Sequence, residues 1–282
     1  MTPQDYDFVR NLLKERSGLV LSADKQYLLE SRLLPVARKA GLANLGELIR
    51  QLKVAAVSPL ATTVIEAMTT NESFFYRDKA PFEHFSNFVM PALMKARAAE
   101  RQIRIWCMAA ATGQEPYSLA MSLKEMGAAL AGWRIEILAT DISSAALEKA
   151  KAGMYSQFEV QRGLPVQRLV KYFKRVGELW QITPDIRAMV SYQHFNLLQD
   201  FTAFGSFDVV FCRNVLIYFD QPTKSDVLNR LARSMKPDGY LLLGAAETVV
   251  GLTPAFRPMP EHRGVYVPAP APAKILQFAA AS

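Results

Sequence analysis

The fold is decided by the stretch Ile103-Arg-Ile-Trp-Cys-Met-Ala-Ala-Ala-Thr-Gly-Gln-Glu-Pro-Tyr-Ser-Leu-Ala-Met121. Alternating apolar residues predict a strand over 103–107. The small residues at 108–113 permit a tight turn, and Pro116 suits the first turn of a helix, where its missing N–H would have no partner. A strand, a small-residue loop and a helix start together form the unit that holds a nucleotide-like ligand in doubly wound α/β folds.

The loop belongs to neither of the two common phosphate-binding patterns. It has one glycine, Gly113, where the dinucleotide fingerprint G-x-G-x-x-G needs three, and no Gly-Lys-Ser/Thr of a P-loop follows. The alanines at 109–111 still leave room for a smaller, adenosine-bearing ligand across the strand end.

Composition sets the outer bounds on the class of protein. The chain has 282 residues, of which 50% are hydrophobic, enough for a large core in one large or two ordinary domains. The net charge of +7 indicates either an anionic partner or a dispersed, solvated basic surface. Cys107 and Cys212 lack metal-type spacing and are expected as buried, reduced thiols. With no membrane-length apolar run and no signal peptide, we expect a soluble, cytoplasmic protein without membrane insertion.

Residues 1–75 predict a small all-α domain. Helix starts are indicated at Thr2-Pro3, Ser22, Asn44 and Ser58-Pro59. Basic residues outnumber acidic ones on the second and third of these helices, and they are Lys25, Arg32, Arg38, Lys39, Arg50 and Lys53. This pattern fits an ordinary solvated face or a docking surface for an acidic protein helix, and both interpretations stay open.

Residues 92–268 alternate strands with helices, which predicts an α/β sheet with parallel strands. The aromatic-rich residues 69–78 and a linker helix over 76–91 precede it, and residues 269–282 read as a disordered Pro/Ala tail. After the first strand we expect strands over 134–140, 190–195, 207–212 and 240–244, a turn at 237–239, a β-hairpin inserted near 170–190 and a closing hairpin over 257–267.

Polar side chains stand just beyond the predicted strands. They are Glu115, Asp141, Asn196 and Asn214. Because ligands bind at the carboxyl edge of open α/β sheets, these groups are expected to share one site. Asp141 suits a hydrogen-bond acceptor for ribose hydroxyls, although Asp141 or Ser143 could instead cap the helix that follows.

Five sequence blocks in the same order resemble the chemotaxis receptor glutamate O-methyltransferases, the CheR family, from about residue 5 to 268. The blocks are Thr69-Thr-Asn-Glu-Ser-Phe-Phe-Tyr-Arg77, Thr112-Gly-Gln-Glu-Pro-Tyr-Ser118, Ala139-Thr-Asp-Ile142, Phe195-Asn-Leu197 and Phe211-Cys-Arg-Asn-Val-Leu-Ile-Tyr-Phe219. The resemblance implies an N-terminal helical domain and a Rossmann-like methyltransferase domain with a small inserted β-subdomain. It also implies S-adenosylmethionine as methyl donor, S-adenosylhomocysteine as product, and no metal.

The same resemblance implies roles for individual residues. Arg77 and Tyr218 would lie nearest the transferred methyl group. The donor would contact Asn71, Ser73, Arg77, Glu115, Asp141, Asn196, Leu197, Arg213 and Asn214. On the docking interpretation of the basic second helix, the helical domain would bind the cytoplasmic helical domain of methyl-accepting chemoreceptors through Arg32, Arg38 and Lys39. The hairpin near Gly177 is shorter and less glycine-rich than in members that bind a receptor's C-terminal pentapeptide, so we expect no such tether, and we expect a monomer.

The residue inventory fits this chemistry. A glutamate carboxylate is already nucleophilic at neutral pH, so the enzyme must mainly align the reactants and exclude water. Two alternatives remain. A nucleic-acid methyltransferase would suit a basic chain, but the fourth strand ends in Arg213-Asn-Val215 rather than Asn/Asp-Pro-Pro-Tyr, and we expect no nucleic acid partner. A non-catalytic S-adenosylmethionine-binding signalling module would have no evident need for both Arg77 and Tyr218.

Overall fold

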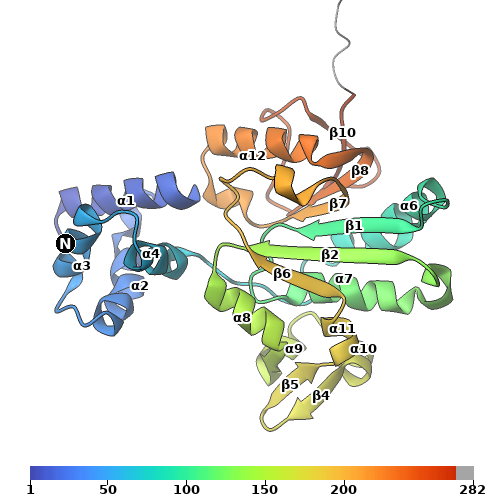
Figure 1. The fold of residues 1–282 in the computed structure, drawn as a ribbon, viewed down its shortest axis with the longest axis horizontal. Coiled ribbons are helices and arrows are strands. Elements are labelled where there is room, and N and C mark those ends of the chain that lie inside the picture. The colour runs from blue at the N-terminus through green and yellow to red at the C-terminus, as the bar shows by residue number, and fades with distance from the viewer. Residues whose placement is uncertain (271–282) are drawn as a thin grey trace, which may run out of the picture.

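The computed structural model describes residues 1–270, and a helical N-terminal part lies beside an α/β part (Figure 1). The helical part contains α1 (Pro3–Ser17), α2 (Gln26–Lys39), α3 (Leu45–Val54) and α4 (Pro59–Met68). Leu13, Leu29, Leu33 and Leu48 are fully buried at its centre. The predicted tail falls almost wholly on residues 271–282, outside the described residues.

Side-chain caps explain where three of these helices begin. The Thr2 hydroxyl accepts from the Asp5 N–H while the Asp5 carboxylate accepts from Thr2, a capping box. Asn44 and Ser58 cap α3 and α4 in the predicted positions. Ser22 differs from the prediction, because it precedes the 3₁₀ turn η1 (Ala23–Lys25), and α2 starts only at Gln26.

A seven-stranded sheet forms the centre of the α/β part, with strand order β6-β2-β1-β7-β8-β10-β9. Its strands are β1 (Gln102–Cys107), β2 (Arg134–Asp141), β6 (Val190–His194), β7 (Phe207–Cys212), β8 (Met235–Leu243), β9 (Phe256–Pro258) and β10 (Val265–Pro268). The strands from β6 to β8 pair in parallel, as predicted, and the antiparallel β9–β10 hairpin closes the sheet.

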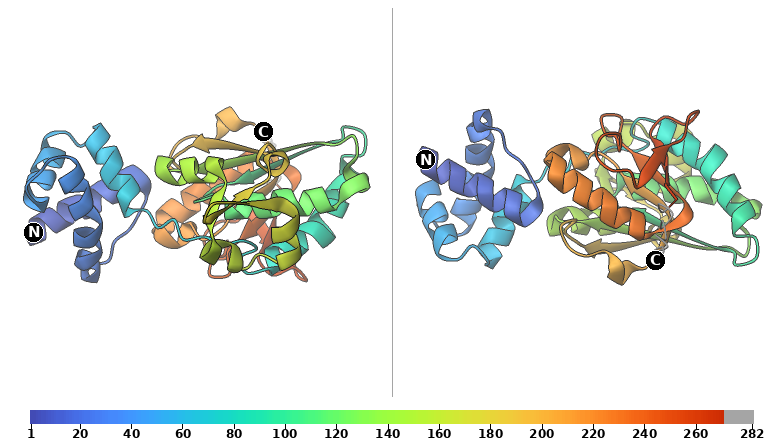
Figure 2. Two further views of the ribbon diagram at one scale, coloured as in Figure 1. Left: turned by 90° about the horizontal axis from the view of Figure 1, so that it is seen from below. Right: turned by 90° about the horizontal axis from the view of Figure 1, so that it is seen from above.

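Alternating side chains divide the core between the two faces of the sheet. Ile105 and Cys107 of β1 pack on the face covered by α7 (Gln114–Glu125), whereas Trp106 packs on the face covered by α12 (Gln221–Arg233). The helix α8 (Ser144–Ala152) contacts β2 and β6. Helices therefore cover both faces, as the ribbon views show (Figure 2).

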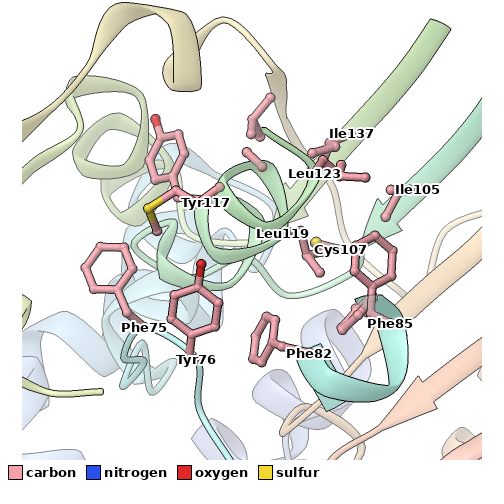
Figure 3. Packing of buried hydrophobic residues seen from close by; sticks show 14 of the residues in the cluster. Phe75, Tyr76, Phe82, Phe85, Ile105, Cys107, Tyr117, Leu119, Leu123 and Ile137 are labelled. Carbon is pink, nitrogen blue, oxygen red and sulfur yellow. The ribbon is translucent and has the colours of Figure 1, made fainter. Parts of the chain in front are cut away.

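The helix predicted as a linker over 76–91 begins and ends later. It consists of α5 (Ala80–His84), the π-helical turn η2 (Phe85–Val89) and α6 (Met90–Ala96). Its start is delayed because Tyr76, Asp78 and Lys79 have positive φ angles, which no helix contains. Phe82 and Phe85 pack against the sheet and α7 (Figure 3), so the segment belongs to the core of the α/β part.

The predicted hairpin insertion is present and is larger than the sequence indicated. β4 (Phe173–Val176) and β5 (Leu179–Ile182) pair around Gly177, and a third strand, β3 (Met154–Ser156), adds to β5. The short helices of this β-subdomain are α9 (Gln157–Gln161), α10 (Val166–Tyr172) and α11 (Pro184–Arg187). The sequence missed β3 because three residues carry no periodic pattern.

The turn predicted at 237–239 is wrong. These residues lie within β8, whose register against β7 shifts between Phe207 and Val209. Phe207 pairs with Met235 and Val209 pairs with Tyr240, so the Pro-Asp-Gly sequence forms an irregularity in a continuous strand. The preceding helix, α12, ends at Arg233.

The strand order reverses next to β1, since β2 lies on one side of it and β7 on the other. Ligands of open α/β sheets bind at the carboxyl edge of such a switch point. The short 3₁₀ turn η5 (Leu216–Tyr218), which follows β7, lies at this edge. Two other 3₁₀ turns of the α/β part are η3 (Gly127–Leu130), which precedes β2, and η4 (Thr202–Phe204), which precedes β7.

Candidate functional site

A pocket opens at the carboxyl ends of β1, β2 and β7 and brings together all the residues predicted for donor binding and methyl transfer. Its lining includes every residue expected to contact the donor, together with Tyr218: Asn71, Ser73, Arg77, Glu115, Asp141, Asn196, Leu197, Arg213 and Asn214. Apolar walls come from Met108, Ile142 and Phe195. The pocket thus combines apolar surface with a few polar groups, which is the usual composition of a small-molecule site.

Asp141 ends β2 with a buried carboxylate. Its oxygens accept from the backbone N–H groups of Ala111 at 2.8 Å and Ser143 at 2.9 Å. Burial raises the pKa of Asp141 above its ordinary value of 3.8, against the lowering effect of these N–H donors. The Ser143 hydroxyl caps α8, so that Asp141 is not the helix cap. Each carboxylate oxygen keeps acceptor capacity for a ligand hydroxyl.

Glu115 and Arg213 form a buried ion pair in the wall of the pocket. The Arg213 guanidinium donates to Glu115 Oε2 at 2.8 Å, to Asp78 Oδ2 at 2.7 Å and to the Arg77 carbonyl at 2.9 Å. Burial raises the pKa of Glu115, and Arg213 partly offsets that effect. Arg213 Nε is buried and has no hydrogen-bond partner among the described residues.

The connecting segment (residues 69–79) lines one side of the pocket and carries Arg77. Its position is set by Tyr76, whose N–H donates to the Ser118 hydroxyl and whose own hydroxyl donates to the Ser118 carbonyl. Arg77 is half-buried; it donates to the Glu72 carbonyl at 3.0 Å, and its guanidinium lies 5.5 Å from the Phe74 ring centroid.

The β-subdomain contacts the same segment from the other side. Arg162 pairs with Glu72 at 2.7 Å and lies 4.4 Å from the centroid of the Phe74 ring. A Cβ added at Gly163 would lie 2.1 Å from the Phe75 carbonyl oxygen, so only glycine allows this approach. These contacts therefore couple the position of Arg77 to that of the β-subdomain through residues 72–75.

The helical part contributes a wall that the sequence did not predict. Ser17 and Leu19 line the pocket, and the Val20 N–H donates to the Tyr218 carbonyl at 2.9 Å. Asn196 joins the two parts, because its side-chain amide donates to the Arg16 carbonyl at 2.6 Å. These contacts join residues that are far apart in the sequence, and no sequence pattern predicts them.

Of the three predicted docking residues, Arg32 differs from the other two. Its guanidinium donates to the Met68 and Thr69 carbonyls at 2.6 and 2.9 Å and to the Thr70 hydroxyl. Arg32 thus anchors the connecting segment to α2. Arg38 and Lys39 are exposed in the last turn of α2.

Comparison with known proteins identifies the chain. Residues 4–69 match the family described as "CheR methyltransferase, all-alpha domain" and residues 71–265 match "CheR methyltransferase, SAM binding domain". The chain belongs to the CheR methyltransferase family. It is 41% identical over 264 residues to chemotaxis protein methyltransferase 1 of Pseudomonas aeruginosa, covering 92% of each chain.

Two further relatives are also named chemotaxis protein methyltransferases. The chain is 40% identical to chemotaxis protein methyltransferase Cher2 of Pseudomonas putida, covering 88% of this chain and 91% of that one. It is 34% identical to the chemotaxis protein methyltransferase of Escherichia coli, covering 88% and 85%. The chain is therefore an S-adenosylmethionine-dependent methyltransferase of chemotaxis, with the Rossmann-like fold and the N-terminal helical domain that the sequence predicted.

The pocket suits the donor of CheR enzymes. The unpartnered Arg213 Nε, the accepting oxygens of Asp141 and the apolar walls match a ligand with charged, ribose and aromatic parts. Among residues 1–270, no group of three or more His, Cys, Asp or Glu side chains could hold a metal ion. No helix in that range is long and apolar enough to cross a membrane.

Proposed function

We propose that the protein transfers the methyl group of S-adenosylmethionine to glutamate side chains of chemoreceptors, giving glutamyl methyl esters and S-adenosylhomocysteine. One observation carries the proposal: the ten residues that the family resemblance assigns to donor binding and methyl transfer, from Asn71 to Tyr218, all line one pocket. The methyl donor supplies an electrophilic methyl group, so the acceptor carboxylate needs no general base.

Within this proposal, Asp141 accepts hydrogen bonds from the ribose hydroxyls, and the Glu115–Arg213 pair contacts the charged amino-acid end of the donor. Asn196 and Leu197 flank the adenine side together with Ile142. Supporting features are the spare acceptor capacity of Asp141 and the free Nε of Arg213. The buried, low-dielectric setting strengthens each of these interactions.

On the acceptor side of the pocket, the proposed roles belong to Arg77 and Tyr218. Arg77 orients the acceptor carboxylate or the donor, since a guanidinium presents paired donors in the geometry that a carboxylate accepts. Tyr218 lines the methyl channel. Water exclusion by the connecting segment and by Leu19 leaves the carboxylate oxygen poorly solvated, which favours attack on the methyl group.

Docking of the receptor's helical cytoplasmic domain is proposed for the exposed basic end of α2, at Arg38 and Lys39, with Arg32 in an anchoring role. The two-residue loop between β4 and β5 supports the prediction that no pentapeptide tether binds there. A monomer, cytoplasmic localisation and the absence of a metal also stay predictions.

The test is methyl transfer from S-adenosylmethionine labelled in its methyl group to a chemoreceptor cytoplasmic fragment. We expect base-labile label, as for a carboxyl ester, at glutamates and at none of their Gln variants. Arg77→Ala and Tyr218→Phe should each lower kcat about tenfold or more while the exposed control Arg233→Ala keeps it. Base-stable label would indicate another acceptor group. Tight S-adenosylhomocysteine binding without transfer to any receptor would favour the signalling module.

A further inference from the structure

Glu247 is a buried carboxylate outside the predicted site. It follows β8 in a tight turn, where its N–H donates to the Gly244 carbonyl at 3.0 Å, and only 9% of the residue is exposed. All its hydrogen-bond donors are backbone N–H groups: Asn214 at 2.7 Å and Gly244 at 2.8 Å on Oε2, and Val215 at 2.9 Å and Leu216 at 2.8 Å on Oε1. Four donors fill the approximately four acceptor positions of a carboxylate.

Three of these donors belong to consecutive residues of the loop after β7. Asn214 has a left-handed φ of 57°, and its N–H therefore points in the same direction as those of Val215 and Leu216. The turn η5 starts here, and its N-cap residue, Val215, forms no side-chain cap hydrogen bond. Glu247 supplies the missing cap from the loop after β8, which satisfies N–H groups that a helix start leaves without partners.

The close approach of the two loops depends on Gly244. A Cβ at this position would lie 2.7 Å from Glu247 Oε2 and 3.0 Å from both the backbone N and the side-chain Nδ2 of Asn214. The 2.7 Å approach is closer than real Cβ atoms come, and the 3.0 Å approaches are tighter than most, so a side chain would displace the Glu247 carboxylate and press on the Asn214 loop. Gly244 and Glu247 together therefore fix where the loop of Asn214 can lie.

We propose that Glu247 is a positioning residue for methyl transfer. It touches neither donor nor acceptor and is absent from the pocket lining, but the loop that it holds presents Asn214 at one end and Tyr218 at the other, and both line the pocket. The Glu247 carboxylate thereby fixes the positions of both Asn214, which contacts the donor, and Tyr218, which lines the methyl channel. This inference rests on the proposed function for its catalytic part only.

The test compares full-length wild type with Glu247→Gln, and with Glu261→Gln as an exposed carboxylate control. A glutamine turns one accepting oxygen into an NH₂ group that faces N–H donors. In the ligand-free protein, hydrogen exchange at the amides of 214–216 should accelerate about tenfold or more. The Kd for S-adenosylhomocysteine should rise, and kcat should fall about tenfold, with Glu261→Gln unchanged in all three.

A double-mutant cycle separates positioning from general damage. If Glu247 acts through Tyr218, Glu247→Gln should lower kcat far less in a Tyr218→Phe background than in wild type. An equal loss in both backgrounds, or unchanged exchange and unchanged kcat, would overturn the proposal. If Glu247→Gln fails to fold, Glu247→Asp keeps both oxygens on a shorter side chain and is put through the same cycle. Should wild type methylate no glutamate, the proposed function fails, and amide exchange with S-adenosylhomocysteine affinity still decides whether Glu247 holds the loop.

Discussion

Asp141 and Glu115 carry carboxylates in the pocket wall whose pKa values burial raises above the ordinary 3.8 and 4.5. Both protonate at a higher pH than an exposed carboxyl does. Because a protonated Asp141 accepts ribose hydroxyls poorly, the affinity for S-adenosylhomocysteine should fall as the pH is lowered through these raised values. Linkage gives the sign for the ligand-free fold: the stability these groups contribute is present at acidic pH and is lost as the pH rises through their raised pKa values.

Calorimetric titration from about pH 7 downward checks this expectation. Wild-type affinity should decline at a pH above the ordinary carboxyl range. Asp141→Asn should bind weakly at neutral pH and should lack the Asp141 contribution to the pH dependence. Wild-type affinity that stays flat until below pH 4, or full affinity in Asp141→Asn, would contradict the ribose role.

At the scale of elements, the contact between the β-subdomain and the connecting segment should be needed for donor binding. Gly163→Ala places a Cβ against the Phe75 carbonyl, whereas Gly177→Ala, also at positive φ, meets nothing within 4 Å. Both variants carry backbone strain of roughly 1–3 kcal/mol, but only Gly163→Ala should displace residues 72–77. Calorimetry should therefore find weaker S-adenosylhomocysteine binding in Gly163→Ala alone; equal losses in the two variants would refute the connection.

Elements with their own periodicity were predictable, and elements set by distant contacts were not. The alternation in β1 and the apolar run of β7 led directly to the parallel sheet and to its carboxyl edge. The strand β3 is too short for a pattern, and Pro237-Asp-Gly239 has turn chemistry that pairing with β7 overrides. The same division holds in the site: Asp141 follows a recognisable strand, but Leu19, which lines the pocket, and Glu247, which holds the Asn214 loop, lie in loops whose position only the folded chain determines.

At the scale of the whole molecule, the basic end of α2 should attract an acidic receptor helix by long-range electrostatics. The double charge reversal Arg38→Glu/Lys39→Glu should raise the KM for the receptor roughly tenfold and weaken its dependence on salt, while the KM for S-adenosylmethionine stays unchanged. Reversal of two exposed charges elsewhere, Arg233→Glu/Lys236→Glu, is the matched control. Equal effects of both double variants would mean that only net charge matters.

Because Ser17 and Leu19 form part of the pocket wall, the helical part of this protein cannot be exchanged freely for that of another. A docking module is usually exchanged by cutting at the linker, here near residue 70. In this chain such a graft would also remove the Val20 contact to Tyr218 and the Arg16 carbonyl that holds Asn196. Chimeras with a new receptor specificity should thus retain residues 16–20 along with the catalytic domain, and replace only the exposed faces of α2 and α3.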